Sequence, residues 1–127
     1  MKTIEVVAAI IEHEGRILAT QRGYGDFKDG WEFPGGKMEP GETPAQCLER
    51  ELMEELELRV HAGEALAEVE REEGGRMIRL IFIAAELCAT EALSLHVHGK
   101  AVWALPSELD RYAFCPGDAA FLSRGLL

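Results

Sequence analysis

The chain has 127 residues, 47% of them hydrophobic, which predicts a single domain over residues 1–127 with a core of its own. Its net charge of −10 excludes the basic surface that binding to a nucleic-acid duplex requires. The longest apolar runs, Val6–Ile11 and Leu80–Ala85, are far too short to span a membrane, and we expect neither a signal peptide nor a membrane partner.

The N-terminal third predicts a β-hairpin followed by a loop. Thr3–Glu12 is rich in β-branched residues and predicts a strand that is buried on both faces. Arg16–Arg22 is expected to return beside it as the second strand of the hairpin. The glycine-rich and aspartate-rich segment Gly23–Gly30 is then a loop, and Trp31–Pro34 is a short extended segment.

A helix is predicted from Pro44 to about Glu57. Thr43 is a suitable N-cap, and proline fits the first helical position. An apolar stripe suited to packing on a core follows the helical period, and its members are Ala45, Leu48, Leu52 and Leu56.

The same helix carries an acidic face. Glu51, Glu54 and Glu55 are spaced i, i+3 and i+4, so they repel one another by roughly 0.2–0.5 kcal/mol per pair on an exposed helix. A divalent cation would reverse the sign of that interaction, and clustered carboxylates suit Mg²⁺ when a phosphorylated substrate supplies further ligands. From the helix alone, a solvated acidic face is an equally good interpretation.

The C-terminal half predicts more strands and two helices. Val60–Glu72 and Met77–Leu87 are expected to be strands joined by a tight turn, the second of them central in the sheet. Ala101–Leu105 is a last short strand, Pro106–Tyr112 opens like a short helix, and a final helix runs from Pro116 to about Leu126. This order predicts an α/β (α+β) sandwich in which helices cover a mixed β-sheet.

The spacing G-x5-E-x7-R-E-U-x-E-E, where U is aliphatic, runs from Gly36 to Glu55. It resembles the Nudix box of the Nudix hydrolase family. The resemblance implies the Nudix fold, an α/β/α sandwich with a mixed β-sheet. One position departs from the box, because Glu57 stands where the family has a glycine that helps to end the helix. We therefore expect the helix either to run on or to end in a non-glycine turn.

The resemblance also implies roles for residues of the box. Nudix enzymes hydrolyse a nucleoside diphosphate linked to another group, and they use a divalent metal ion. By position, Glu51, Glu54 and Glu55 are the metal-binding carboxylates, and the carbonyl of Gly35 is a further ligand. Arg50 is expected to orient a box glutamate, with an ordinary surface arginine as the alternative. Arg50, Glu51 and Glu54 are thus the candidate catalytic residues, with Mg²⁺, or alternatively Mn²⁺, as the ion.

The similarity extends beyond the box. The segments IEVVAAIIE, RILATQR and WEFPGGKMEPGET resemble the subfamily that contains MutT and the CTP pyrophosphohydrolase. This likeness implies that Arg22 meets the substrate phosphates, the alternative being a salt bridge at the strand end. Asp118 is expected to read the base, the alternative being a helix cap. Arg76 and Arg79 are expected either to contact the nucleotide or to pair on the surface.

One further departure bears on turnover. Close relatives carry a glutamate six residues before the tryptophan of the last strand, and this chain has Val97 there. The resemblance implies a nucleoside triphosphate pyrophosphohydrolase that releases a nucleoside monophosphate and pyrophosphate. We expect it to act on 8-oxo-dGTP or on cytosine nucleotides (CTP or dCTP) and to clear damaged or surplus nucleotides. The alternative is a nucleotide-binding or sensor module with weak or no turnover.

The cysteines indicate the cellular compartment. Three widely spaced cysteines without zinc-ligand spacing indicate free thiols, so we expect a cytoplasmic protein. We expect it to be a monomer or a homodimer.

Overall fold

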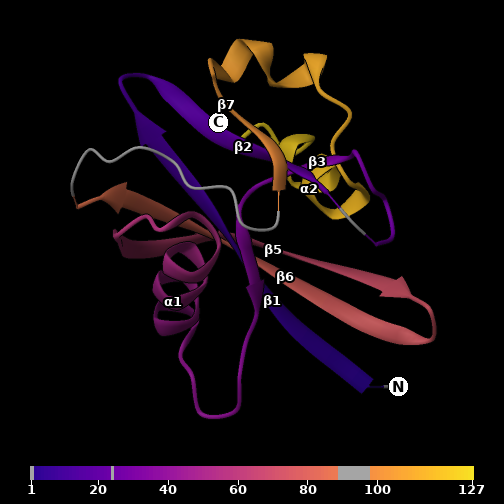
Figure 1. The fold of residues 1–127 in the computed structure, drawn as a ribbon. Coiled ribbons are helices and arrows are strands. Elements are labelled where there is room, and N and C mark those ends of the chain that lie inside the picture. The colour runs from indigo at the N-terminus through magenta and orange to yellow at the C-terminus, as the bar shows by residue number, and fades with distance from the viewer. Residues whose placement is uncertain (1, 24, 89–97) are drawn as a thin grey trace.

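A computed structural model describes residues 2–23, 25–88 and 98–127 of the chain. The described elements, in chain order, are β1 (Lys2–His13), β2 (Arg16–Arg22), β3 (Trp31–Glu32), β4 (Gly35–Lys37), α1 (Pro44–Leu56), β5 (Val60–Glu73), β6 (Arg76–Leu87), β7 (His98–Ala104), the 3-10 helix η1 (Pro106–Arg111) and α2 (Pro116–Leu122). Helix α1 packs on one side of the sheet, and η1 and α2 pack on the other (Figure 1). The predicted α/β/α sandwich with a mixed sheet is confirmed.

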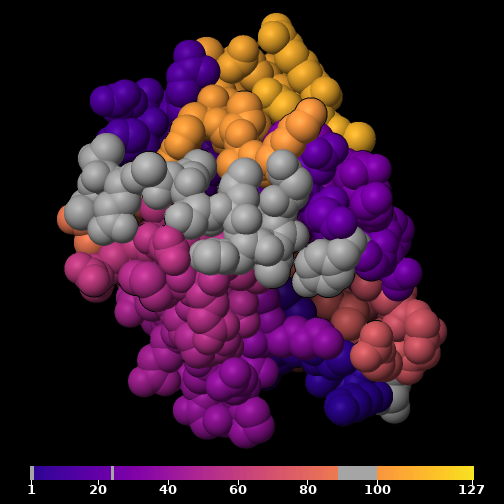
Figure 2. All heavy atoms as spheres, viewed as in Figure 1, coloured from indigo at the N-terminus to yellow at the C-terminus, as the bar shows by residue number. Residues whose placement is uncertain are grey.

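Strand β1 lies in the middle of the sheet. It pairs in parallel with β6, from Lys2 opposite Arg76 to Ile11 opposite Ala85. Strand β5 pairs antiparallel on the other side of β6, so β6 is a central strand as predicted. In the space-filling view, the tip of the β5–β6 hairpin lies beside the N-terminal end of β1 at the right-hand edge of the face (Figure 2).

The predicted β1–β2 hairpin is confirmed next to its turn. Glu12 and His13 pair with Ile17 and Arg16, and the two strands then separate. Strand β4 takes the place beside β1, antiparallel, at Val6, Val7 and Ala8 of that strand. Strand β2 pairs instead with β3 and with β7.

The two faces of β1 build two different cores. Val7, Ala9 and Ile11 pack in one cluster with the buried leucines of α1. Ala8 and Ile10 pack in a second cluster, which includes side chains of α2 and η1. Because successive residues of a strand point to opposite faces, one run of apolar residues packs against both layers. The strand is thus buried on both faces, as predicted.

Helix α1 begins as predicted. The Gln46 N–H donates to the Thr43 hydroxyl, and the Thr43 N–H donates to the Gln46 side chain, so the two residues form a capping box. The helix ends at Leu56, because Glu57 adopts a left-handed conformation with φ 53° and ψ 33°. The non-glycine turn, one of the two expected exits, is therefore the one observed.

The C-terminal helix is shorter than predicted. It ends at Leu122 rather than near Leu126, so that predicted boundary is wrong by about one turn. The N–H groups of Arg124 and Gly125 donate to carbonyls three residues back, which tightens the chain, and Gly125 has φ 68°. No helix among the described residues is long and apolar enough to cross a membrane.

Candidate active site

Two glycines of β4 let three parts of the chain meet closely. A Cβ atom on Gly35 would collide with the carbonyl oxygen of Val7 in β1. A Cβ atom on Gly36 would lie 2.5 Å from Oε2 and 2.7 Å from Oε1 of Glu51. The glycines thus allow β4 to approach β1 and the Glu51 carboxylate to approach β4.

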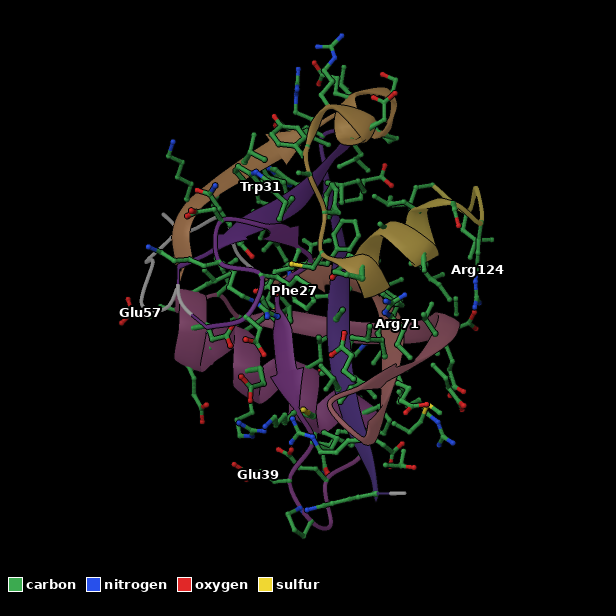
Figure 3. All side chains as sticks on the ribbon, turned by 90° about the vertical axis from the view of Figure 1, so that its right-hand side faces the viewer. Phe27, Trp31, Glu39, Glu57, Arg71 and Arg124 are labelled. Carbon is green, nitrogen blue, oxygen red and sulfur yellow. The ribbon has the colours of Figure 1, made fainter. Side chains whose placement is uncertain are left out.

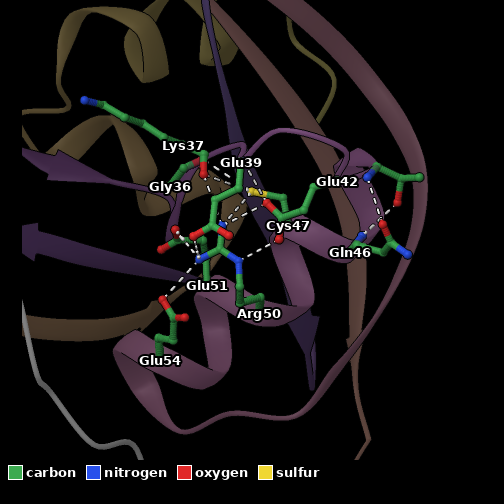
Figure 4. A network of polar contacts seen from close by, with 10 residues as sticks. Gly36, Lys37, Glu39, Glu42, Gln46, Cys47, Arg50, Glu51 and Glu54 are labelled. Carbon is green, nitrogen blue, oxygen red and sulfur yellow. Dashed lines mark hydrogen bonds and ion pairs between the residues drawn. The ribbon is translucent and has the colours of Figure 1, made fainter.

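Arg50 connects the helix with the loop that precedes it (Figure 4). Its Nε and Nη2 donate to the two carboxylate oxygens of Glu42, at 2.6 and 2.9 Å. Its Nη1 donates to Glu51 at 3.0 Å and to Glu54 at 3.1 Å. This geometry favours the predicted orienting role over that of an ordinary surface arginine, because one guanidinium fixes three carboxylates.

Glu42 holds the loop that precedes α1. Its carboxylate also accepts a hydrogen bond from the backbone N–H of Glu39 at 2.9 Å. The hydrogen bond from Arg50, followed by this backbone contact, lowers the pKa of Glu42 to about 2. The carboxylate is therefore charged at neutral pH.

The three glutamates of the acidic face have different surroundings. Glu51 has a side chain only 14% exposed, whereas Glu54 is 59% exposed. Burial and the negative charge of Glu55 raise the pKa of Glu51 to about 7, although Arg50 acts in the opposite direction. Across the described residues, no three acidic, histidine or cysteine side chains converge as a ready-made metal site.

The donor set nevertheless fits a divalent ion. Glu51 and Glu55 both line one cavity, in which Glu51 is largely buried and the negative charge of Glu55 acts on it. Carboxylate and carbonyl oxygens are the ligands that Mg²⁺ prefers, and its charge would offset the crowding. Glu54 shares the Nη1 nitrogen of Arg50 with Glu51, and it makes this contact through Oε2.

Glu51 and Glu55 line a cavity of about 490 Å³. Among the predicted site residues, those that line it are Arg22, Gly35, Glu51, Glu55, Arg76 and Asp118. Arg50 and Glu54 are not among the lining residues and act from beside it. The structure thus brings together residues from both ends of the sequence around one space.

Arg22 forms the salt bridge given as its alternative, and it also lines the cavity. Its Nε and Nη2 donate to Glu32 Oε1 at 3.1 and 2.8 Å, which is the salt bridge at the strand end. Its Nη1 donates to the carbonyl of Asp26 at 2.7 Å. Because the same side chain lines the cavity, it also lies where a phosphate could meet it.

Asp118 lies in the first turn of α2, and its interpretation as the helix cap is wrong. The cap position is Cys115, because the helix already begins at Pro116. Asp118 is 6% exposed, and its Oδ1 accepts a hydrogen bond from the Phe33 N–H at 3.1 Å. Burial raises the pKa of this carboxyl to about 7. It is therefore a buried titratable group on the wall of the cavity.

The two arginines of the β5–β6 hairpin differ. Arg76 lines the cavity. Arg79 pairs with Glu70 at 3.2 Å and with Glu5 at 3.6 Å, which is the surface pairing given as its alternative. Val97 lies outside the described residues.

Sequence reasoning missed several lining residues. Glu32 and Phe33 are separated from the two glycines by Pro34 alone, so their position in the chain was an available signal. Phe27 and the β6 residues Ile78 and Leu80 gave no comparable signal, because the first lies in a loop and the others look like ordinary strand residues.

The comparison with known families decides the identity. The profile of the NUDIX domain matches residues 1–124. The chain belongs to the Nudix family. This Nudix chain is 44% identical over 124 residues to the CTP pyrophosphohydrolase of Escherichia coli K12, covering 96% of this chain and 90% of that protein. It is 35% identical over 125 residues to the 8-oxo-dGTP diphosphatase of Haemophilus influenzae, with 97% and 91% covered.

Solved structures agree. The solution structure of the E. coli ORF135 protein matches with a TM-score of 0.83 and 44% identity, covering 97% of this chain and 88% of that one. The crystal structure of a MutT protein from Methanosarcina mazei Go1 matches with a TM-score of 0.85 at 22% identity over 97% and 92%, a likeness of fold alone. The predicted Nudix hydrolase is confirmed, and hydrolases of this family generally need a divalent metal ion.

Proposed function

We propose that this Nudix hydrolase is a Mg²⁺-dependent nucleoside triphosphate pyrophosphohydrolase with cytosine nucleotides, CTP or dCTP, among its preferred substrates. Water attacks phosphorus, and the products are a nucleoside monophosphate and pyrophosphate. The observation that carries the base preference is the buried carboxyl of Asp118 on the wall of the cavity that also holds Glu51 and Glu55.

The chemistry of Asp118 suits a base edge that offers a donor next to an acceptor. A carboxyl with a pKa of about 7 can accept from an exocyclic amino group and, when protonated, donate to a neighbouring ring nitrogen. Cytosine presents that pair at N4 and N3, and adenine presents it at N6 and N1. The 44% identical CTP pyrophosphohydrolase of E. coli favours cytosine. An 8-oxoguanine also presents such a pair, through its N7–H and O6, whereas ordinary guanine presents two acceptors there. Oxidised dGTP is therefore the second candidate, and the 35% identical diphosphatase of H. influenzae supports it.

The remaining site residues are assigned to the phosphates and to the metal ion. Arg22 and Arg76 contact phosphate oxygens from the cavity wall. The side chains of Glu51, Glu54 and Glu55 would hold the ion together with the Gly35 carbonyl. When bound, a divalent ion neutralises phosphate oxygens and activates the attacking water. Arg50 acts as a positioning residue. Its Nη1 donates to both Glu51 and Glu54, and its positive charge offsets the repulsion between the two carboxylates.

The role that fits is clearance of damaged or surplus nucleotides in the cytoplasm, by a monomer or a homodimer. A sensor that binds nucleotide with little turnover is the rival. Val97, in place of the glutamate of close relatives, is the sequence feature that favours the rival. The complete set of box carboxylates favours the enzyme, because a binding module has no need of them.

The deciding experiment is pyrophosphate release with Mg²⁺ across the ordinary nucleoside triphosphates, 8-oxo-dGTP and modified dCTPs, with EDTA as the control. We expect selective turnover of the cytosine group or of the oxidised purine. Binding of nucleotides without turnover of any of them would overturn the enzymatic proposal in favour of a sensor.

The metal assignment has its own test. Glu54→Gln should lower kcat by about 100-fold or more. It should leave the melting temperature nearly unchanged, because this side chain is 59% exposed. Glu64→Gln on β5, an exposed residue away from the cavity, is the matched control. Near-full activity of Glu54→Gln would show that the metal ligands are wrongly assigned.

A further inference from the structure

Phe27 is an aromatic side chain that core packing leaves unexplained. It lines the cavity, yet it is 51% exposed and belongs to neither core cluster. Its backbone has φ 59°, a left-handed conformation that a bulky residue rarely adopts. Strain of this kind persists where the surrounding contacts fix the chain, and it is common at ligand-binding sites.

The loop that carries Phe27 is held by several hydrogen bonds. The Gly30 N–H donates to the Phe27 carbonyl at 2.9 Å. Arg22 binds the loop through its side chain, which donates to the Asp26 carbonyl at 2.7 Å, and through its backbone carbonyl, which accepts from the Asp29 N–H at 2.9 Å. The exposed ring is therefore presented by a fixed backbone.

The backbone of the Phe27 loop lies close to the start of α2, the helix that carries Asp118. A Cβ atom on Gly30 would be 2.9 Å from the Phe27 carbonyl oxygen and 2.8 Å from Sγ of Cys115. The loop therefore packs against the residue that caps α2, three positions before Asp118 (Figure 3). Phe33 is 3% exposed and donates its N–H to Asp118.

We propose that Phe27 stacks on the outer face of the nucleobase while Asp118 reads the edge of that base. This inference rests on the proposed function, since it supplies the substrate with a base. An aromatic ring half open to solvent loses exposed apolar area when a flat base covers it, and stacking of this kind accepts every base. Phe27 thus sets affinity for nucleotides over base-free phosphates, while Asp118 sets the choice among bases.

The test compares Phe27→Ala and Phe27→Trp with wild type on CTP and on ribose 5′-triphosphate, which lacks a base. We expect Phe27→Ala to raise KM for CTP about tenfold, which is about 1.4 kcal/mol, with kcat changed by less than about twofold. Its KM for ribose 5′-triphosphate should stay within about twofold of wild type, and Phe27→Trp should restore the KM for CTP. Leu126→Ala removes an equally exposed side chain, 52%, outside the cavity and serves as the control.

Binding of the product separates this inference from the proposed function. The dissociation constants of CMP and of ribose 5-phosphate, measured by calorimetry without metal, require no turnover. If wild type hydrolyses no triphosphate but Phe27→Ala weakens CMP alone, the proposed function fails and the stacking role stands. An unchanged KM for CTP, or an equal loss on the base-free compounds, overturns the stacking role and makes Phe27 a structural part of the loop.

Discussion

Gly36 of β4 lies directly against the carboxylate of Glu51 in α1, with no room for a side chain between them. In Gly36→Ala the new methyl group would displace the end of a flexible side chain and leave the backbone in place, so the fold should survive. A shift of about 1 Å in a reacting group can cost about 100-fold in rate, and we expect a loss of that order in kcat. Thermal melting and steady-state kinetics check both parts.

Gly35→Ala is the contrasting variant for that experiment. Its methyl group would meet the Val7 carbonyl, which is backbone, so we expect loss of stability before loss of chemistry. Near-wild-type kcat in Gly36→Ala would show that the position of Glu51 is not critical.

Metal binding should depend on pH through Glu51. In the free enzyme, burial and Glu55 raise the pKa of Glu51 to about 7, so this carboxyl is mostly protonated at pH 6. A metal ion needs the charged form, so each ion bound below pH 7 must displace that proton, and apparent affinity should fall up to about tenfold per pH unit. Calorimetry with Mg²⁺ at pH 6 and pH 8 measures this, and Glu51→Gln should abolish the pH dependence. Equal Mg²⁺ affinity of wild type at the two pH values would contradict the assignment.

Stability should depend on pH through Asp118. Its pKa rises from 3.8 in the unfolded chain to about 7 in the fold. The stabilising contribution of the protonated group is therefore fully present below about pH 4 and is lost as the pH rises through 7, by at most about 1.4 kcal/mol per pH unit. In Asp118→Asn this titration is absent, while Glu51 titrates in both proteins. We expect urea unfolding to show that the free energy of unfolding of the variant, relative to that of wild type, is higher at pH 8 than at pH 5. The same difference at both pH values would refute the raised pKa.

The exit of α1 offers a stabilising change. Glu57 occupies a left-handed conformation that glycine adopts without steric cost. Glu57→Gly should raise the free energy of unfolding by about 0.5–1 kcal/mol, the steric relief being partly offset by the greater freedom of glycine in the unfolded chain. The matched control is Gly41→Ala, at φ 82° with open space around it, which should change stability in the opposite direction. Denaturant unfolding measures both, and a loss of stability in Glu57→Gly would show that contacts of Glu57 outweigh its backbone strain.

The sequence predicts α1 well because the signals for it are local. Thr43 and Pro44 mark its start, and the apolar period from Leu48 to Leu56 marks its buried face, so both are confirmed. The end of α2 is mispredicted because Ser123 and Arg124 are compatible with a helix, and only Gly125 behind them shows where the last turn tightens.

The cavity is less predictable because long-range pairing assembles it. The separation of β2 from β1 admits β4 beside Val7, and no local pattern encodes that exchange. The contact between Asp118 and the Phe33 N–H joins residues 85 positions apart. The resemblance to a family placed Asp118 at the base, whereas the residues alone allowed a helix cap equally well.

The alternation along β1 separates two kinds of substitution. Val7, Ala9 and Ile11 support the layer that carries Glu51, Glu54 and Glu55, and Ala8 and Ile10 support the layer that carries Asp118. Under the proposed function, base recognition and bond cleavage therefore depend on opposite faces of a single strand. Substitutions that repack the second cluster can then change the base preference without repacking the cluster that supports α1.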